Sequence, residues 1–79
     1  MARTIKVSGK VEELTDLSLE SLQKQVGGYI EMVTLPNGQT MIVNEDGIAK
    51  DLSPNLKASR LAGQVIRGHV VLCNKGELV

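Results

Sequence analysis

The feature that most constrains this chain is the dipeptide Asn37-Gly38, which stands between two β-prone runs. Asparagine and glycine tolerate the positive φ that a tight hairpin turn requires, so this pair is the strongest short-range signal for a β-hairpin. It predicts strands over residues 29–35 and 40–43. Pro36 is expected at the end of the first strand, because proline cannot donate a hydrogen bond to a ladder. The fold must therefore contain this antiparallel hairpin.

Two segments carry the signals of short helices. The first follows Ser18, whose hydroxyl can cap the free amides of a first turn, and it ends at Gly27, which adopts a left-handed conformation at no steric cost. The second follows Ser53, another candidate cap, with Pro54 at the first helical position, where an N–H would have no partner. Gly63 is expected to end it. The first helix is so short that we expect tertiary packing to hold it.

The remaining strands lie near the two ends of the chain. Residues 4–7 alternate polar and apolar side chains, as a half-buried strand does, and Val11 begins a weaker extended segment. Residues 64–73 form the longest β candidate, in which the apolar run 70–73 indicates burial on both faces. Gly68 interrupts this segment and indicates a bulge.

The order of these elements predicts the fold class. We expect an α+β domain with a small, mostly antiparallel sheet of about four strands and two short helices packed on one face. A chain of 79 residues has room for one core, so residues 1–79 are expected to form a single domain, with residues 77–79 as a short tail strand or a frayed end. A domain this small buries only about 60% of its unfolded surface, which favours a homo-oligomer.

Charge and composition exclude several classes of function. Nine lysines and arginines balance nine acids, whereas a nucleic-acid binder of the basic-patch kind needs a surplus of cations. Tyr29 is the only aromatic residue, and a platform for stacked bases normally needs about two or three. One histidine and one cysteine cannot supply a closed zinc site, so we expect no metal and no cofactor.

The same features predict the compartment and argue against catalysis. No run approaches the ~18 apolar residues of a membrane span, and no hydrophobic segment follows Met-Ala-Arg-Thr, so we expect neither an anchor nor a signal peptide. The single cysteine, Cys73, is typical of a reducing cytoplasm. Along an extended strand it would lie about 13 Å from His69, too far for activation of the thiol. We therefore expect a cytoplasmic protein that is not an enzyme.

Four segments carry a family resemblance. They are, in chain order, SLESLQKQVGGYIE at 18–31, VNEDG at 43–47, SPN at 53–55 and IRGHVV at 66–71. Together they resemble a family of small proteins of unknown function found in bacteriophages, plasmids and scattered bacteria, over nearly the whole chain. The GGYIE step is the most specific part, and His69 departs from the family pattern, where a proline or similar residue is expected. The resemblance implies a mobile-element origin and a bacterial cytoplasm, and it brings no catalytic motif.

Six residues are candidates for binding a ligand or partner. They are Tyr29, Ser53, Asn55, Arg60, Arg67 and His69. Arg67 and His69 flank Gly68, and residues two apart in a strand point the same way, so the pair is placed to grip a phosphate or a partner carboxylate. The alternative is a pair of charges that protects a sheet edge from aggregation.

The other candidates each have a structural alternative. The helix start at Ser53-Pro54-Asn55 offers free amides that attract anions, and Arg60 can reach such an anion, but capping and an exposed helical arginine explain the same residues. Tyr29 is either a ring that stacks on a ligand, particularly at a subunit boundary, or a packing residue.

Two functions follow from these expectations. In the first, the chain is a non-enzymatic binding protein of phage or mobile-element type that occupies a host component, such as a defence or regulatory protein, through the hairpin or a sheet edge. In the alternative, a homo-oligomer encloses a small anionic, nucleotide-like signalling ligand between its subunits. Arg60, Arg67 and His69 would then face the phosphates and Tyr29 the ring. Neither function involves a membrane or a nucleic acid.

Overall fold

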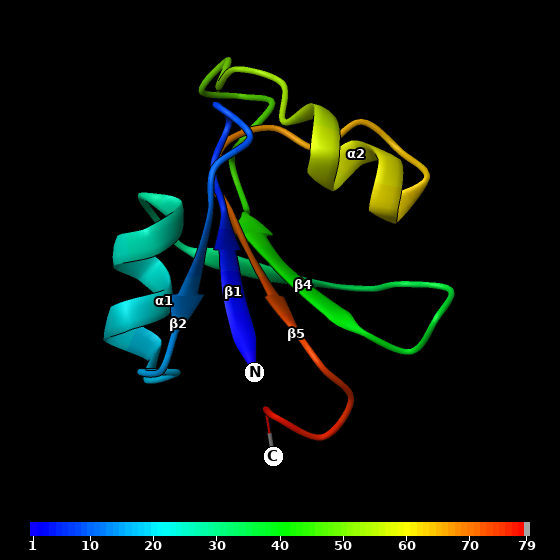
Figure 1. Ribbon diagram of the computed structural model, residues 1–79. Helices are drawn as coiled ribbons and strands as arrows, with labels where there is room; N and C mark the ends of the chain where they lie inside the picture. Colours follow the sequence, from blue (N-terminus) through cyan, green and yellow to red (C-terminus); the bar gives the residue numbers. More distant parts are fainter. Residues whose placement is uncertain (79) are drawn as a thin grey trace.

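The chain folds around a five-stranded antiparallel sheet, seen in a computed structural model that describes residues 1–78 (Figure 1). The elements are β1 (Ala2–Ile5), β2 (Val11–Leu14), α1 (Leu19–Val26), β3 (Ile30–Thr34), β4 (Thr40–Asn44), α2 (Leu56–Ala62) and β5 (Val70–Cys73). The strand order is β2-β1-β5-β4-β3. The predicted α+β class is confirmed. The sheet has five strands rather than about four, because the weak segment at Val11 pairs with β1 along its whole length.

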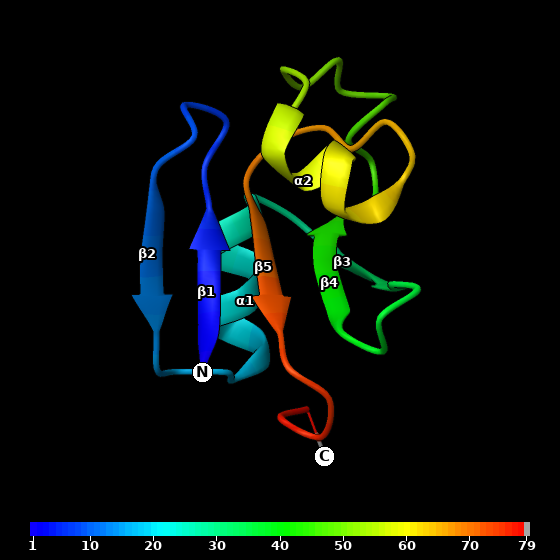
Figure 2. The same ribbon diagram turned by 45° about the vertical axis from the view of Figure 1, so that its right-hand side comes forward.

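The two helices cover opposite faces of the sheet, so the expectation that both pack on one face is wrong (Figure 2). Leu22 of α1 belongs to a cluster with Val71, whereas Ala58 of α2 belongs to a second cluster with Val70 and Leu72. Successive side chains of a strand point to opposite faces. The apolar run of β5 therefore supplies both cores, and its predicted burial on both faces is confirmed.

Helix α1 begins and ends at the predicted residues. The Ser18 hydroxyl accepts a hydrogen bond from the N–H of Ser21 at 3.3 Å. Gly27 has a φ of 80°, and its N–H donates to the carbonyl of Gln23. Both ends were predictable because capping depends only on residues within one turn of the helix end.

Helix α2 is capped by Asn55 rather than by Ser53. The Asn55 Oδ1 accepts from the N–H of Ala58 at 3.1 Å, and its Nδ2 donates to the carbonyls of Ile5 and Gly68, both at 3.0 Å. The side chain is fully buried. An amide offers an acceptor and two donors, so Asn55 caps the helix and also ties it to β1 and to the segment before β5, which a serine hydroxyl cannot do.

Residues 64–69 form a loop instead of the first half of a long strand. The N–H of Asn55 donates to the carbonyl of Ile66, and the N–H of Gly68 donates to the carbonyl of Ser53, both at 2.8 Å. These backbone groups are thus paired with the start of α2 and not with a neighbouring strand. Gly68, with a φ of 82°, turns the chain into β5.

The hairpin forms where it was predicted, but Asn37 and Gly38 are not its two central turn residues. The N–H of Gly38 donates to the carbonyl of Leu35 at 3.0 Å, so Pro36 and Asn37 lie at the centre of the turn. Gly38 has a positive φ of 90°, whereas Asn37 does not. The N–H of Leu35 donates to the carbonyl of Gln39 at 2.8 Å, and β3 pairs with β4 along its full length.

In the C-terminal tail, Leu78 lies in a turn rather than a strand, and Val79 of the predicted tail lies outside the described residues.

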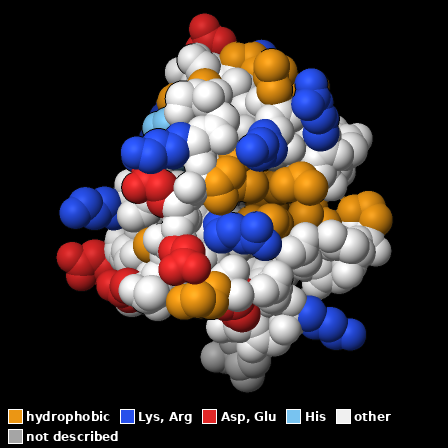
Figure 3. All heavy atoms as spheres, viewed as in Figure 1, with side chains coloured by type: hydrophobic (Ala, Val, Ile, Leu, Met, Phe, Trp, Pro, Cys, Tyr) orange, Lys and Arg blue, Asp and Glu red, His pale blue; other side chains and the backbone are white. Residues whose placement is uncertain are grey.

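Helix α2 is short and lies over one end of its face of the sheet (Figures 1 and 2). Below it, hydrophobic side chains gather in full view over the sheet, with lysine and arginine side chains around them (Figure 3). This face is therefore only partly covered.

Within residues 1–78, neither helix has the length and apolar character that crossing a bilayer requires.

Replacing Gly68 with alanine is expected to lower the free energy of unfolding by about 2 kcal/mol. A Cβ at this position would lie 2.9 Å from Cδ1 of Leu52, and the positive φ adds strain. Gly63 is the matched control, because it also has a positive φ but would place a Cβ in open space. Gly63→Ala should cost about 1 kcal/mol. Urea denaturation measures both, and equal losses would mean that Leu52 contributes no clash.

Candidate functional site

The free edge of β3 is the first part of the candidate site. Within residues 1–78, β3 pairs only with β4. The N–H of Leu35 donates to the carbonyl of Gln39, and the N–H of Glu45 donates to the carbonyl of Tyr29. Since bonded and non-bonded pairs alternate in an antiparallel ladder, odd-numbered residues of β3 bond to β4 and even-numbered ones direct their N–H and C=O outward. The outward set is Ile30, Met32 and Thr34.

The opposite edge, β2, is protected by charge. Its sequence is Val-Glu-Glu-Leu, and Glu12 forms an ion pair with Lys6 at 2.9 Å. The hydrogen bond from Lys6, and then its charge, hold the pKa of Glu12 below the ordinary value. Charged edge strands resist pairing with another chain. The β3 edge instead exposes 58% of Met32 and, just before the strand, 69% of Tyr29, with Glu31 as its single charge.

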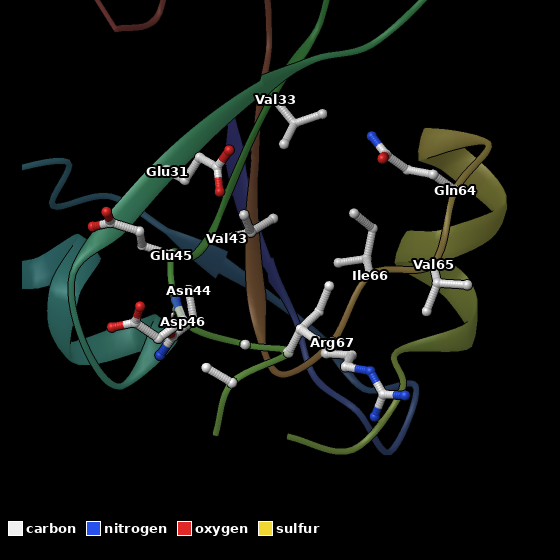
Figure 4. A pocket seen from close by; sticks show the side chains of 13 residues that line it. Glu31, Val33, Val43, Asn44, Glu45, Asp46, Gln64, Val65, Ile66 and Arg67 are labelled. Carbon is white, nitrogen blue, oxygen red and sulfur yellow. Dashed lines mark hydrogen bonds between the residues drawn. The ribbon is translucent and has the colours of Figure 1, made fainter. Parts of the chain in front are cut away.

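A cleft of about 490 Å³ lies beside β3 on the α2 side of the sheet (Figure 4). Its walls come from β3, β4, the turn after β4 and the loop that precedes β5. Val33, Val43 and Ile66 converge on its interior, and they belong to or pack against the core under α2. Val65 on the loop is 68% exposed. The cleft is therefore an apolar hollow that opens close to the free strand.

The carboxylates of the cleft lie together on one side. Glu31 extends its carboxylate toward the interior above Val43, and Glu45 and Asp46 follow on the same side but point outward (Figure 4). The ion pairs found within residues 1–78 involve none of these three acids. The mouth of the cleft next to β3 is thus electronegative.

Arg67 lies on the other side of the cleft, and its guanidinium is already engaged. Its Nη1 donates to the carbonyl of Leu52 at 2.9 Å and lies 3.6 Å from Oδ1 of Asp51. His69 lines a different cleft. The prediction that Arg67 and His69 share a face is therefore wrong, because this segment is a loop turned at Gly68 and strand alternation does not apply to it.

The second cleft, of about 410 Å³, lies near the C-terminal end of α1. Ser53, Lys24 and His69 line it together with apolar side chains that include Leu52, and none of the described residues around it carries a carboxylate. The His69 Nδ1 accepts a hydrogen bond from the backbone N–H of Val7 at 3.1 Å. A neutral His69 therefore carries its proton on Nε2.

The structure does not bring the six predicted site residues together. Ser53 and His69 line the second cleft, and Arg67 lines the first. Tyr29 and Arg60 are exposed but border neither. The asparagine that caps α2 is buried with its polar atoms bonded inside the protein, which gives it a structural role.

Glu31 and the apolar residues around it were not among the site residues predicted from the sequence. The sequence signal that could have identified them is the single carboxylate of Glu31 within a mostly apolar predicted strand. The cleft itself joins β3 and β4 to residues 64–67, and no local pattern reports that contact.

The described part of the chain offers little reactive chemistry. Burial, and then the charge of Glu77, raise the pKa of the Cys73 thiol above its ordinary value, so the thiol stays protonated at neutral pH. The backbone N–H of Ser18 donates to Asp16 and lowers the pKa of that carboxyl. Residues 1–78 contain no group of three or more histidine, cysteine or acidic side chains placed to hold a metal.

The fold and the clefts define a class of protein, a small α+β domain in which the edge strand β3 lies beside a cleft with carboxylates at its mouth. The chain belongs to the family described as a domain of unknown function, DUF3846, whose model matches residues 2–78. This confirms the expected membership in a family of unknown function. Neither a curated protein nor a solved structure matches the chain.

Proposed function

We propose that this chain is a non-enzymatic binding protein that attaches to a partner protein by receiving one of the partner's strands at the free edge of β3. The observation that carries the proposal is the outward backbone of Ile30, Met32 and Thr34 beside the cleft. In strand addition, main-chain hydrogen bonds supply affinity and adjoining pockets supply specificity. Both parts lie next to each other here.

The partner we propose is a host protein, such as a defence or regulatory protein, that the chain disables or redirects by occupying it. The support for this step is the resemblance to phage and plasmid proteins, since a small protein of a mobile element acts inside a foreign cell. Binding through an added strand at β3 needs no catalytic group. This agrees with the protonated, buried thiol of Cys73 and with the lack of a metal-holding cluster among the described residues.

Met32→Pro is expected to abolish capture of the partner. Proline removes the outward N–H of residue 32 but none of the bonds to β4, which use the odd-numbered residues, and edge strands tolerate proline. The measurement is affinity capture from bacterial lysate with wild-type and variant protein as bait, followed by titration of the recovered protein. We expect at least about a hundredfold loss of affinity, because proline also clashes with an approaching strand.

Met32→Ala is the matched control, since it removes the same exposed side chain and keeps the N–H. It should capture the partner nearly as well as wild type. A partner held equally by Met32→Pro, or no saturable partner for the wild type, would overturn strand addition at β3.

A second candidate function is a homo-oligomer that sequesters a small anionic ligand. The observation that favours it is the second cleft, where Lys24 and His69 lie without a carboxylate among the described residues around them. Native mass spectrometry and thermal shifts with nucleotides test it. A monomer whose melting temperature ignores nucleotides would eliminate this candidate, and a retained anionic ligand would replace the first one.

A further inference from the structure

We infer that the cleft beside β3 is a specificity pocket for a lysine or arginine side chain of the added strand. The inference rests on the proposed function, because it assumes a strand at the β3 edge. It specifies which partner strand binds. Three features support it: the side-chain length needed to enter the cleft, the apolar residues that line the cleft, and the negative charge of Glu31.

Reach limits the side chain that can enter. An added strand would lie about 4.8 Å outside β3, whereas the floor of the cleft includes Val43 on β4, one strand further in. The entering side chain must therefore cross over β3. Short aliphatic side chains stop at Val33, but lysine and arginine have stems long enough to cross apolar surface and keep the charged end in contact with water.

The walls fit such a side chain along its length. Val33, Val43 and Ile66 offer apolar surface to a methylene stem. The carboxylate of Glu31 extends toward the interior above Val43, where the cationic end of a side chain that has crossed β3 can meet it (Figure 4). The Arg67 guanidinium is turned to the carbonyl of Leu52, so it does not neutralise Glu31.

The ladder fixes where the basic residue stands in the partner. An added strand bonds to Ile30, Met32 and Thr34, and a residue directly opposite Glu31 projects to the same face as Glu31. Opposite charges directly across a ladder stabilise it. The partner strand should therefore carry a basic residue opposite Glu31 and an apolar residue two positions away, opposite Val33.

Selection from a displayed library of random short peptides tests the inference, with wild-type, Glu31→Gln and Met32→Pro protein as baits. The wild type should enrich peptides with a basic residue two positions from an apolar one. Glu31→Gln should enrich peptides without the basic preference, and it should bind the best wild-type peptide about fivefold more weakly. Changing the basic residue of that peptide to glutamine should remove most of this difference between the two proteins.

The outcomes separate the two claims. Peptides that lack a basic residue but still require the N–H of residue 32 would overturn the pocket and leave strand addition standing. Peptides that bind Met32→Pro as well as wild type, or no enrichment at all, would overturn both. If the protein is a dimer that Met32→Pro separates, a second copy occupies the edge and the basic partner strand is ruled out.

Discussion

Replacing Asn55 with alanine should remove a large part of the folding stability of the chain. The buried carbonyls of Ile5 and Gly68 and the N–H of Ala58 would lose their partner, and each unsatisfied buried group costs about 1–3 kcal/mol. We expect a total loss of about 3–4 kcal/mol, against a stability of about 4–12 kcal/mol for a chain of this length. Urea denaturation followed by far-ultraviolet circular dichroism measures the loss.

Two variants control this experiment. Ser53→Ala should change the free energy of unfolding by less than about 0.5 kcal/mol, because Ser53 is exposed and does not cap α2. Asn55→Asp keeps the cap to Ala58 but aims a carboxylate at two carbonyls, so it should destabilise nearly as much as alanine. A large loss from Ser53→Ala with a small loss from Asn55→Ala would show that the cap is assigned to the wrong residue.

Replacing Met41 with alanine is expected to cost about 2–4 kcal/mol, because it opens a cavity in the core under α2. Met41 is completely buried on β4. On the adjacent strand β3, Met32 precedes Val33, the cross-strand partner of Met41, and therefore lies on the opposite face of the sheet. Its side chain is largely exposed, so Met32→Ala should cost less than about 0.5 kcal/mol.

Urea midpoints of these two variants compare the same substitution on adjacent strands. Similar losses at both positions would contradict the faces assigned to the hairpin. The comparison also shows whether Met32→Ala is stable enough to serve as the control for Met32→Pro in the partner-capture experiment.

The hairpin and α1 could be predicted because their signals are local. Gly38 supplies the positive φ that the hairpin turn uses, and Ser18 and Gly27 form hydrogen bonds within one turn of the ends of α1. The α+β class followed from the order of such elements. None of these features depends on distant contacts.

The errors arose where distant contacts decide the structure. Asn55 outcompetes Ser53 as the cap because it also meets the carbonyl of Ile5, fifty residues away in sequence. The loop before β5 is held by the start of α2, so Arg67 and His69 separate. Side chains alternate between two faces only within a strand, and β5 begins only at Val70, which the sequence alone did not show.

The placement of the helices and the cleft depends on topology. The apolar run of β5 indicated two buried faces, and a helix on each face would have satisfied it. The cleft brings Glu31 and Val33 next to Ile66, which requires both the sheet order and the path of the loop after α2.

Amide hydrogen exchange along β3, followed by nuclear magnetic resonance, tests the central claim most directly. In the free protein, the amides of Glu31 and Val33 should exchange slowly and those of Ile30, Met32 and Thr34 quickly, because only the first two are bonded to β4. With a bound partner or selected peptide, strand addition predicts that the three outward amides become slow. Unchanged exchange at these three amides, with new protection elsewhere in the chain, would contradict binding at the β3 edge.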